Sequence, residues 1–172
     1  MGVHMETAYA SSFEAPFGTL SMGATRRGIC AISINDREGL YRWLFRHLDT
    51  REVIERPYYV IKEAEVELRR YLRGKLEQFS VPLDLRGTDF QKQVWQQLLR
   101  IPYGEMFSYE QVAEKIGRGR AARAVGAACG ANPIPIMVPC HRVVGSHHHL
   151  GGYSGGLAVK EWLLRRERAI LI

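Results

Sequence analysis

The sequence predicts an α+β protein, because strand-like patterning comes first along the chain and helical patterning follows it. Residues 7–34 contain turn signals and short apolar alternations, which are typical of paired strands. From residue 37 onward, apolar residues recur at spacings of three and four, which indicates amphipathic helices.

Two turn signals divide the strand-like segment. Residues 15–18, Ala-Pro-Phe-Gly, form the first turn, and apolar alternation over residues 20–24 follows it. Arg27-Gly28 forms the second turn and leads into the apolar residues 29–32. We therefore expect strands on either side of both turns.

Two helices are expected before the middle of the chain. The first covers residues 37–48, with apolar positions at Leu40, Trp43, Leu44 and Leu48. The second covers about 58–73 and ends at Gly74. Its apolar positions are Ile61, Ala64, Val66, Leu68 and Leu72. Residues 84–88 then indicate a linker, which predicts an N-terminal domain of residues 1–86 and a C-terminal domain of residues 87–172.

The C-terminal half predicts a helix followed by a helix-turn-helix. Thr88 is a candidate N-cap for a helix that holds Phe90, Val94, Trp95, Leu98 and Leu99 and stops at residues 102–104. Ser108 can cap a helix over 109–116. Residues 117–120, Gly-Arg-Gly-Arg, form a short turn before a second helix over 121–131. Two short helices joined by a glycine-containing turn are typical of this motif.

The second helix of that motif consists largely of small residues. We expect four of them to face the core: Ala124, Val125, Ala128 and Cys129. The opposite face carries Arg123 and otherwise only Gly126, Ala127 and Gly130. A helix that reads bases in the major groove presents several long polar side chains, and this helix lacks them. Its thin face suits either approach to a minor groove or close helix packing.

Composition narrows the class of protein. Hydrophobic residues make up 46% of the 172 residues, which excludes a disordered chain. No apolar run approaches the roughly 20 residues of a membrane span, so we expect a cytoplasmic protein, associated with the nucleoid in a prokaryote. Residues 88–172 carry 11 Lys and Arg against 6 Asp and Glu, whereas residues 1–87 carry 13 against 12. This basic excess suits either a polyanion partner or a solvated surface.

The segment Asn132–Val144 is the most informative part of the chain. It reads Asn-Pro-Ile-Pro-Ile-Met-Val-Pro-Cys-His-Arg-Val-Val, and its three prolines stiffen it and exclude a regular helix. Cys140 therefore follows a rigid, apolar element and precedes His141. A thiol becomes a useful nucleophile when a base or a cation lowers the cost of its thiolate.

Six motifs in fixed order resemble the O6-alkylguanine-DNA alkyltransferases. They are Ser108-Tyr109, Ala121-Ala122-Arg123-Ala124-Val125-Gly126, Asn132-Pro133, Pro139-Cys140-His141-Arg142-Val143-Val144, Gly152-Tyr153-Ser154-Gly155-Gly156 and Lys160-Glu161-Trp162-Leu163-Leu164. The resemblance is dense over residues 88–168 and weaker over 13–34. It implies the two-domain α+β fold more strongly than the patterning does, with a supporting N-terminal domain and a DNA-binding, alkyl-accepting C-terminal domain.

The resemblance implies single-turnover transfer of an alkyl group from O6-alkylguanine to Cys140. His141 would take the thiol proton through a water, and Glu167 would orient that histidine. Tyr109 would donate a proton to the leaving guanine. Asn132 would tie the helix-turn-helix to the active-site segment, or cap its helix, or both. From the residues alone, Glu167 also suits a solvated carboxylate near Arg165, Arg166 and Arg168.

The remaining implied roles concern the base and the DNA. The carbonyls of Cys140 and Val143, the ring of Tyr153 and the amide of Ser154 would hold the flipped guanine. Arg123 would fill the space that the base leaves, with the thin helix in the minor groove of double-stranded DNA. The helix start at Ala121 and Ala122 and the turn residues Arg118 and Arg120 would meet phosphates. Arg142 suits a structural salt bridge and a DNA contact equally.

No cofactor is expected, and we predict a monomer. Some members of the family bind zinc, but Thr25 and Cys30 stand where two of the ligands would fall, so we predict no structural zinc. The run His147–His149 lacks chelating geometry and is expected in a solvated loop. Three alternative functions are a lesion sensor that binds without transfer, a DNA-binding transcriptional domain, and a cysteine hydrolase that turns over repeatedly. Cys140 argues against the sensor, and the nearly bare helix argues against the transcriptional domain.

Overall fold

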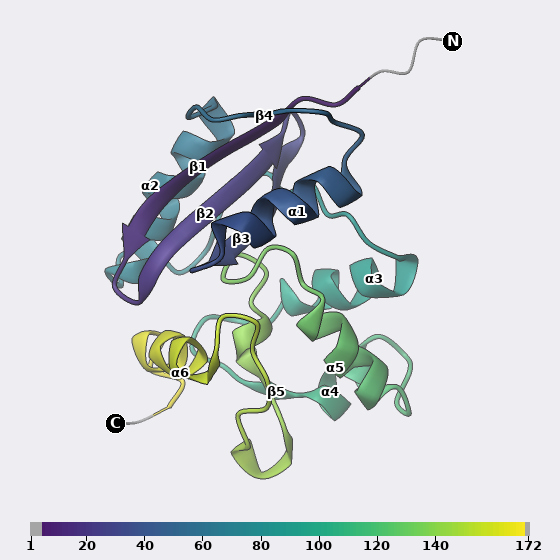
Figure 1. Cartoon of the computed structure of the whole chain (residues 1–172). Coiled ribbons are helices and arrows are strands. Elements are labelled where there is room, and N and C mark those ends of the chain that lie inside the picture. The colour runs from purple at the N-terminus through teal and green to yellow at the C-terminus, as the bar shows by residue number, and fades with distance from the viewer. Residues whose placement is uncertain (1–4, 171–172) are drawn as a thin grey trace. The chain divides into compact units, whose positions relative to one another are not determined.

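A computed structural model describes residues 5–170, and the chain divides into two compact units between Arg86 and Gly87. The first unit contains a four-stranded sheet and two helices, and the second is mainly helical (Figure 1). The α+β class predicted from the sequence is confirmed. In the described residues, no helix is long and apolar enough to cross a membrane.

The sheet of the N-terminal unit has the strand order β3-β2-β1-β4. Its strands are β1 (Ala8–Ala15), β2 (Gly18–Thr25), β3 (Gly28–Ile34) and β4 (Val53–Ile54). The first three strands form an antiparallel meander, and β4 pairs in parallel with β1. Both predicted turns connect consecutive strands of this meander. The two-residue strand β4 is too short to leave a periodic pattern in the sequence.

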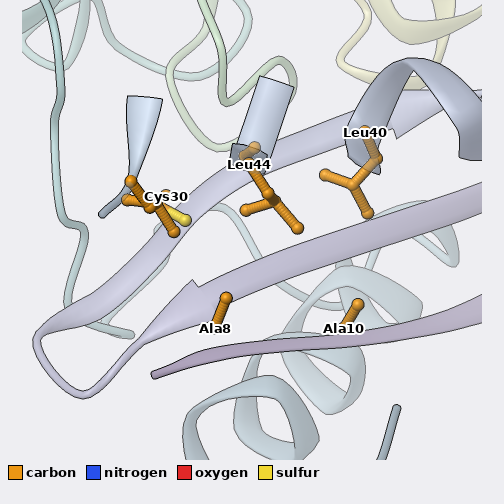
Figure 2. Packing of buried hydrophobic residues seen from close by; sticks show 7 residues of the cluster. Ala8, Ala10, Cys30, Leu40 and Leu44 are labelled. Atoms are coloured by element: carbon orange, nitrogen blue, oxygen red, sulfur yellow. The ribbon is translucent and has the colours of Figure 1, made fainter. Parts of the chain in front are cut away.

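Helices α1 (Arg37–His47) and α2 (Tyr59–Leu72) lie on opposite faces of the sheet (Figure 1). Under α1, the small residues Ala8, Ala10 and Cys30 let the helix approach, and Leu40 and Leu44 fill the space above them (Figure 2). Burying such side chains stabilises the fold by roughly 1.5–3 kcal/mol for each large aliphatic residue.

The predicted apolar face of α2 needs one correction. Ile61, Ala64 and Leu68 are fully buried as expected, but Val66 is 58% exposed. Val66 lies two positions from Ala64 and from Leu68, which turns its side chain to the solvent side of the helix. Val60 and Tyr71 complete the buried face instead.

The C-terminal unit contains the predicted helix-turn-helix. Its elements are α3 (Asp89–Leu98), β5 (Phe107–Ser108), α4 (Tyr109–Lys115), α5 (Ala122–Gly130), the 3-10 helix η1 (Cys140–Arg142), β6 (Val143–Val144), the 3-10 helix η2 (Ser146–His148) and α6 (Leu157–Arg166). Both predicted N-caps are confirmed. The Thr88 and Ser108 hydroxyls accept from the amides of Gln91 and Gln111, and each glutamine side chain accepts from its cap amide.

Helix α5 packs on α3 through one polar tie and a narrow apolar face. The indole N–H of Trp95 donates to the carbonyl oxygen of Ala128 at 2.8 Å, and both Val125 and Ala128 are buried. Ala124 was predicted to pack inward and is exposed. It lies at the edge of the stripe that Val125 and Ala128 define, on a helix only nine residues long. Cys129, also expected in the core, is only partly buried.

Candidate active site and nucleic-acid interface

The segment before the candidate nucleophile is buried without being regular secondary structure. Every residue from 132 to 144 is buried. Pro135 and Val138 form an isolated β-bridge. Between them, Ile136 adopts a left-handed backbone conformation with φ of 75°. A β-branched residue at positive φ is strained and persists only where the surroundings fix it. The predicted rigid element is therefore present, and it delivers Cys140 into the single turn of η1.

Asn132 ties this segment together. Its side-chain amide donates to the carbonyl oxygen of Val138 at 2.9 Å and to the sulfur of Cys140 at 3.1 Å. Its side-chain oxygen accepts from the amide of Ile134 at 3.0 Å. The backbone N–H of Asn132 also donates to the carbonyl oxygen of Cys129 at the end of α5. One buried residue thus links the helix-turn-helix to the thiol, which is the arrangement that the family resemblance implies.

His141, which follows Cys140 in the chain, forms a buried pair with Glu167. Nε2 of His141 lies 2.8 Å from Oε1 of Glu167, and neither side chain has solvent-exposed area. Glu167 follows α6 directly as its C-cap residue. The view of Glu167 as a solvated carboxylate near neighbouring arginines is wrong, since Glu167 is buried and points into this unit.

Arg142 supplies the counter-charge for Glu167. Its Nε donates to Oε2 of Glu167 at 2.9 Å and its Nη2 donates to Oε1 at 2.8 Å, which is the bidentate geometry of a strong pair. Its Nη1 donates to the carbonyl oxygen of Ile101 at 2.6 Å. The question that the sequence left open is settled for this structure: Arg142 is a buried structural partner.

These contacts decide which groups carry charge. Hydrogen bonds from His141 and Arg142 outweigh burial and hold the pKa of Glu167 far below its usual range. Burial lowers the pKa of His141, so the imidazole is neutral at neutral pH. The ionised carboxylate can only accept, so Nε2 of His141 carries the hydrogen and Nδ1 is the basic nitrogen. Burial raises the pKa of Cys140, so the resting thiol needs a base.

Tyr109 reaches the same region through a short strand pair. Phe107 and Ser108 of β5 pair in parallel with Val143 and Val144 of β6, which directly follow η1. Tyr109 begins α4 immediately after β5. A Cβ placed on Gly151 would lie 2.7 Å from the Tyr109 hydroxyl, and one on Gly126 would lie 3.8 Å from its ring. Glycines at these two positions leave room for the ring beside the thiol segment.

The loop after β6 carries the predicted base-holding residues. The Tyr153 hydroxyl is buried, and no hydrogen-bond partner for it lies within the described residues. Burial raises the pKa of Tyr153 well above its usual value, and the nearby Cys140 and Glu167 add to this. Ser154 is exposed beside it. The carbonyl oxygens of Cys140 and Val143 accept from Val143 N–H and from the Lys160 ammonium, respectively, so each keeps one lone pair.

The second helix of the helix-turn-helix presents the thin face that its composition predicts. Arg123, Ala127 and Gly130 are exposed, and Gly126 is partly exposed. A Cβ added to Gly130 would meet nothing within 4 Å. Ala121 is the N-cap and Ala122 the first residue of α5, both partly buried, and Arg118 and Arg120 are exposed in the turn before them. Arg118 lies over the ring of Phe90, 5.5 Å from its centroid.

The residues considered for zinc are engaged otherwise. The Thr25 hydroxyl donates to Asp84 at 2.6 Å, and Arg86 bonds both Asp84 and Glu6. Cys30 is fully buried, and burial raises its pKa to about 12. Within residues 5–170, no group of three or more His, Cys, Asp and Glu side chains could hold a metal ion. His147 and His149 are exposed.

Lys160 is the residue of this site that sequence reasoning missed. It lies within a matched motif, Lys-Glu-Trp-Leu-Leu, but no role was expected for it. Its side chain is fully buried and its ammonium bonds three carbonyl oxygens, those of Val143, Leu150 and Gly152. A charged residue at a regular helix position gives no sequence signal that separates burial from solvation.

Fold and site together define an α+β protein that pairs a helix-turn-helix with a buried cysteine, histidine and glutamate. A model of the DNA-binding domain of 6-O-methylguanine DNA methyltransferase matches residues 89–169. A methylated-DNA–protein-cysteine methyltransferase of Methanosarcina acetivorans is 38% identical over 159 residues, covering 92% of this chain and 97% of the relative. The chain belongs to this methyltransferase family.

Other relatives are more similar over a shorter part of the chain. The methyltransferase of Mycobacterium tuberculosis is 55% identical over 103 residues, which is 60% of this chain and 62% of the relative. This match spans about three fifths of the length of that relative. Among solved structures, Mycobacterium tuberculosis OGT in complex with DNA has a TM-score of 0.82 at 39% identity, covering 93% of this chain and 92% of that one. A Pyrococcus kodakaraensis O6-methylguanine-DNA methyltransferase has a TM-score of 0.64 at 26% identity, covering 94% and 99%.

Proposed function

We propose that this protein repairs DNA by moving an alkyl group from O6-alkylguanine to its own Cys140. The observation that carries this is the buried arrangement of thiol, imidazole and ionised carboxylate beside a helix-turn-helix with a nearly bare second helix. The family relationship supports the same activity, because a relative that matches 92% of the chain is a methylated-DNA–protein-cysteine methyltransferase.

The transfer begins with the thiol proton. His141 is neutral and its Nδ1 is basic, so the proton of Cys140 passes to His141, and Glu167 stabilises the resulting imidazolium. The thiolate electron pair attacks the alkyl carbon, a sulfur–carbon bond forms and the bond from that carbon to O6 breaks. The electron pair of the broken bond stays on the guanine. Asn132 holds the sulfur in place during this step.

The leaving guanine must gain a proton to depart as a neutral base. Burial raises the pKa of Tyr109, so its hydroxyl is protonated at neutral pH. Tyr109 donates this proton to the guanine ring, and the tyrosinate regains a proton as the imidazolium of His141 gives up the proton taken from the thiol. In this proposal the second lone pairs of the Cys140 and Val143 carbonyls accept from the exocyclic amine. Tyr153 walls the base, and the amide of Ser154 bonds O6.

The alkylated base must leave the duplex to reach a buried thiol, at a cost of a few kcal/mol of lost stacking. We assign the Arg123 side chain to the space that the flipped base leaves in the stack. Arg123 is exposed at the start of α5, and the rest of that helix face carries only small residues. The turn arginines Arg118 and Arg120 and the first amides of α5 suit phosphate contacts. The solved complex of the Mycobacterium tuberculosis relative with DNA supports DNA as the partner. We further propose a monomeric, cytoplasmic protein.

The product is a thioether, which has no leaving group that would return the thiol, so the transfer is stoichiometric. Titrating an excess of duplex that contains O6-methylguanine against a known amount of protein tests this. Repair should stop at one lesion per chain. Repair that continues past one equivalent would identify a hydrolase, and tight binding of the lesion without repair would identify a sensor. Absence of both repair and lesion binding would refute the proposal.

A further inference from the structure

A buried cation lies next to the thiol segment and has no role in the transfer described above. Lys160, on α6, has no exposed area. Its ammonium donates to the carbonyl oxygens of Val143 at 2.7 Å, Gly152 at 3.3 Å and Leu150. No carboxylate in the described part of the chain forms an ion pair with it.

The number of acceptors indicates the charge of this group. A protonated lysine has three N–H donors and no acceptor, whereas a neutral amine has only two N–H donors. Three carbonyl oxygens around Nζ use all three donors of the charged form and would leave one oxygen without a donor in the neutral form. Burial lowers the pKa of Lys160, and the nearby Cys140 and Cys129 act in the opposite direction.

The three carbonyls come from two chain segments, β6 and the loop that follows it. Val143 directly follows η1, and its own amide donates to the carbonyl oxygen of Cys140. Leu150 and Gly152 belong to the loop that leads to Tyr153. One ammonium therefore fastens this loop to the residue after the cysteine turn and sets where Tyr153 stands.

The charges around the thiol are unbalanced. Arg142 and Glu167 pair with each other, which leaves Lys160 as the buried cation without a counter-anion among the described residues. The titratable groups that interact electrostatically with it are Cys140 and His141 of η1 and Cys129 of α5, and its charge favours the thiolate of each cysteine and the neutral form of the histidine. A thiolate at Cys140 would supply the missing negative charge.

We propose that Lys160 is a positioning residue whose buried ammonium holds the Leu150–Gly152 loop against Val143 and supplies the positive charge that the Cys140 thiolate needs. This deepens the proposed function and rests on it. Lys160 acts on the transfer through the thiol and the loop, without touching the reacting carbon. Because the charge of Lys160 favours the thiolate form of Cys140, its effect on the thiol is present before any DNA is bound.

The test measures the reaction of Cys140 with iodoacetamide across a range of pH, followed on the Cys140 peptide by mass spectrometry. This reaction needs no DNA, so it reports on the thiol even if the proposed repair activity fails. Lys160→Met keeps the length and apolar stem of the side chain and removes the charge. It should move the midpoint of the pH profile upward by about one unit, which slows the reaction roughly tenfold at neutral pH.

Two further variants separate charge from packing. Lys160→Arg retains the cation and should have a midpoint closer to that of the unchanged protein than to that of Lys160→Met. Arg165→Met removes a cation from the exposed side of the same helix and should leave the profile unchanged. A folded Lys160→Met protein with the original midpoint would overturn the proposal, since a lysine that only fastens the loop would alter thermal stability without moving the thiol titration.

A measurement on the unchanged protein covers the case in which Lys160→Met does not fold. Nitrogen-15 NMR can follow the titration of the Lys160 ammonium before and after Cys140 is methylated. Removing the titrating thiol should change the pH at which Lys160 loses its proton. An identical titration in both forms would show that the two groups do not interact and would overturn the proposal.

Discussion

Nε2 of His141 lies 2.8 Å from Oε1 of Glu167, although 26 positions separate the two residues along the chain. Both side chains are fully buried, and Arg142 bonds both oxygens of the same carboxylate. The guanidinium keeps Glu167 ionised, the carboxylate fixes the tautomer of His141, and the imidazole presents its basic nitrogen. This chain of contacts explains how His141 can act as a base for the Cys140 thiol, although burial raises the pKa of that thiol.

Replacing Arg142 should destabilise the protein strongly. Arg142→Met removes the counter-charge of a buried carboxylate and leaves the carbonyl oxygen of Ile101 without its donor. Breaking a buried ion pair by removing one partner costs roughly 3–5 kcal/mol of unfolding free energy. Urea denaturation monitored by circular dichroism measures this loss.

The surface pair of Arg165 and Glu161 provides the control. Its side chains are 37% and 42% exposed, and exposed pairs contribute only about 0–1 kcal/mol. Arg165→Met should therefore change the unfolding free energy little. Equal losses for Arg142→Met and Arg165→Met would show that Arg142 does not neutralise a buried charge.

Acid should destabilise the fold through His141 and Glu167. Burial lowers the pKa of His141 below its ordinary value of 6.5, so below that pH the unfolded chain binds a proton that the folded chain does not. The pKa of Glu167 is also lowered, so the unfolded chain takes up a second proton first as the pH falls further. Unfolding free energy should decline from about pH 6.5 downward.

The matching variant for this pH dependence is His141→Gln. It removes the titrating imidazole, so the decline should begin only where Glu167 contributes, near the ordinary glutamate value of 4.5. Denaturation curves at a series of pH values make the comparison. A stability that rises as the pH falls from 6.5 would contradict the neutral assignment of His141.

Tyr109→Phe should separate proton donation from packing. The phenylalanine ring keeps the contacts with Gly126 and Gly151 but lacks the hydroxyl. Loss of a general acid slows a reaction by roughly 10²–10⁴-fold. Transfer from a duplex that contains O6-methylguanine should therefore slow by at least about 100-fold. Stopped-flow or quench kinetics with excess protein measure the single-turnover rate. A rate within a factor of about two of the original would remove Tyr109 from the proposed chemistry.

Gly151→Ala tests the same contact from the other side. The added Cβ would lie 2.7 Å from the Tyr109 hydroxyl, and Gly151 has a φ of +71°, which side-chain-bearing residues rarely adopt. We expect slower transfer with less stability. If Gly151→Ala behaves like the original protein, Tyr109 does not occupy the position described.

Arg123 and Arg120 should differ in what they contribute to DNA repair. Both are exposed, so neither substitution by alanine should change the unfolding free energy by more than about 0.5 kcal/mol. Arg123→Ala should impair transfer from duplex DNA, because the flipped-out state loses the group that replaces the base. Arg120→Ala should weaken binding evenly across sequences and reduce its salt dependence. If the two variants had the same transfer rate and the same salt dependence of binding, Arg123 would not be the residue that replaces the flipped base.

Local sequence patterns predicted the elements that are encoded locally. Thr88 and Ser108 are predictable as N-caps because each is a good capping residue directly before an apolar helical pattern. The structure adds a capping box at each position, which the sequence analysis did not predict. The thin face of α5 followed from helical spacing in the same way. Ala124 was assigned wrongly because spacing alone does not show how wide the buried stripe of a short helix is.

The buried polar contacts depended on tertiary structure and could not be predicted from patterns. Two-residue strands such as β5 and β6 leave no periodicity, yet their pairing brings Tyr109 to the thiol segment. Glu167 lies among arginines in the sequence, which favours a solvated position, and only the resemblance to the family indicated its role. Lys160 shows the same limit, because its three carbonyl partners lie outside its own helix, in β6 and the loop that follows it.

The mass of the Cys140 peptide after incubation with O6-methylguanine duplex tests the central claim most directly. Transfer predicts that the intact protein gains the mass of one methylene group and that the gain maps to Cys140, with Cys30 and Cys129 unmodified. Cys140→Ser protein should show no gain. Disappearance of O6-methylguanine with no added mass on Cys140, or with the added mass on another residue, would contradict the account.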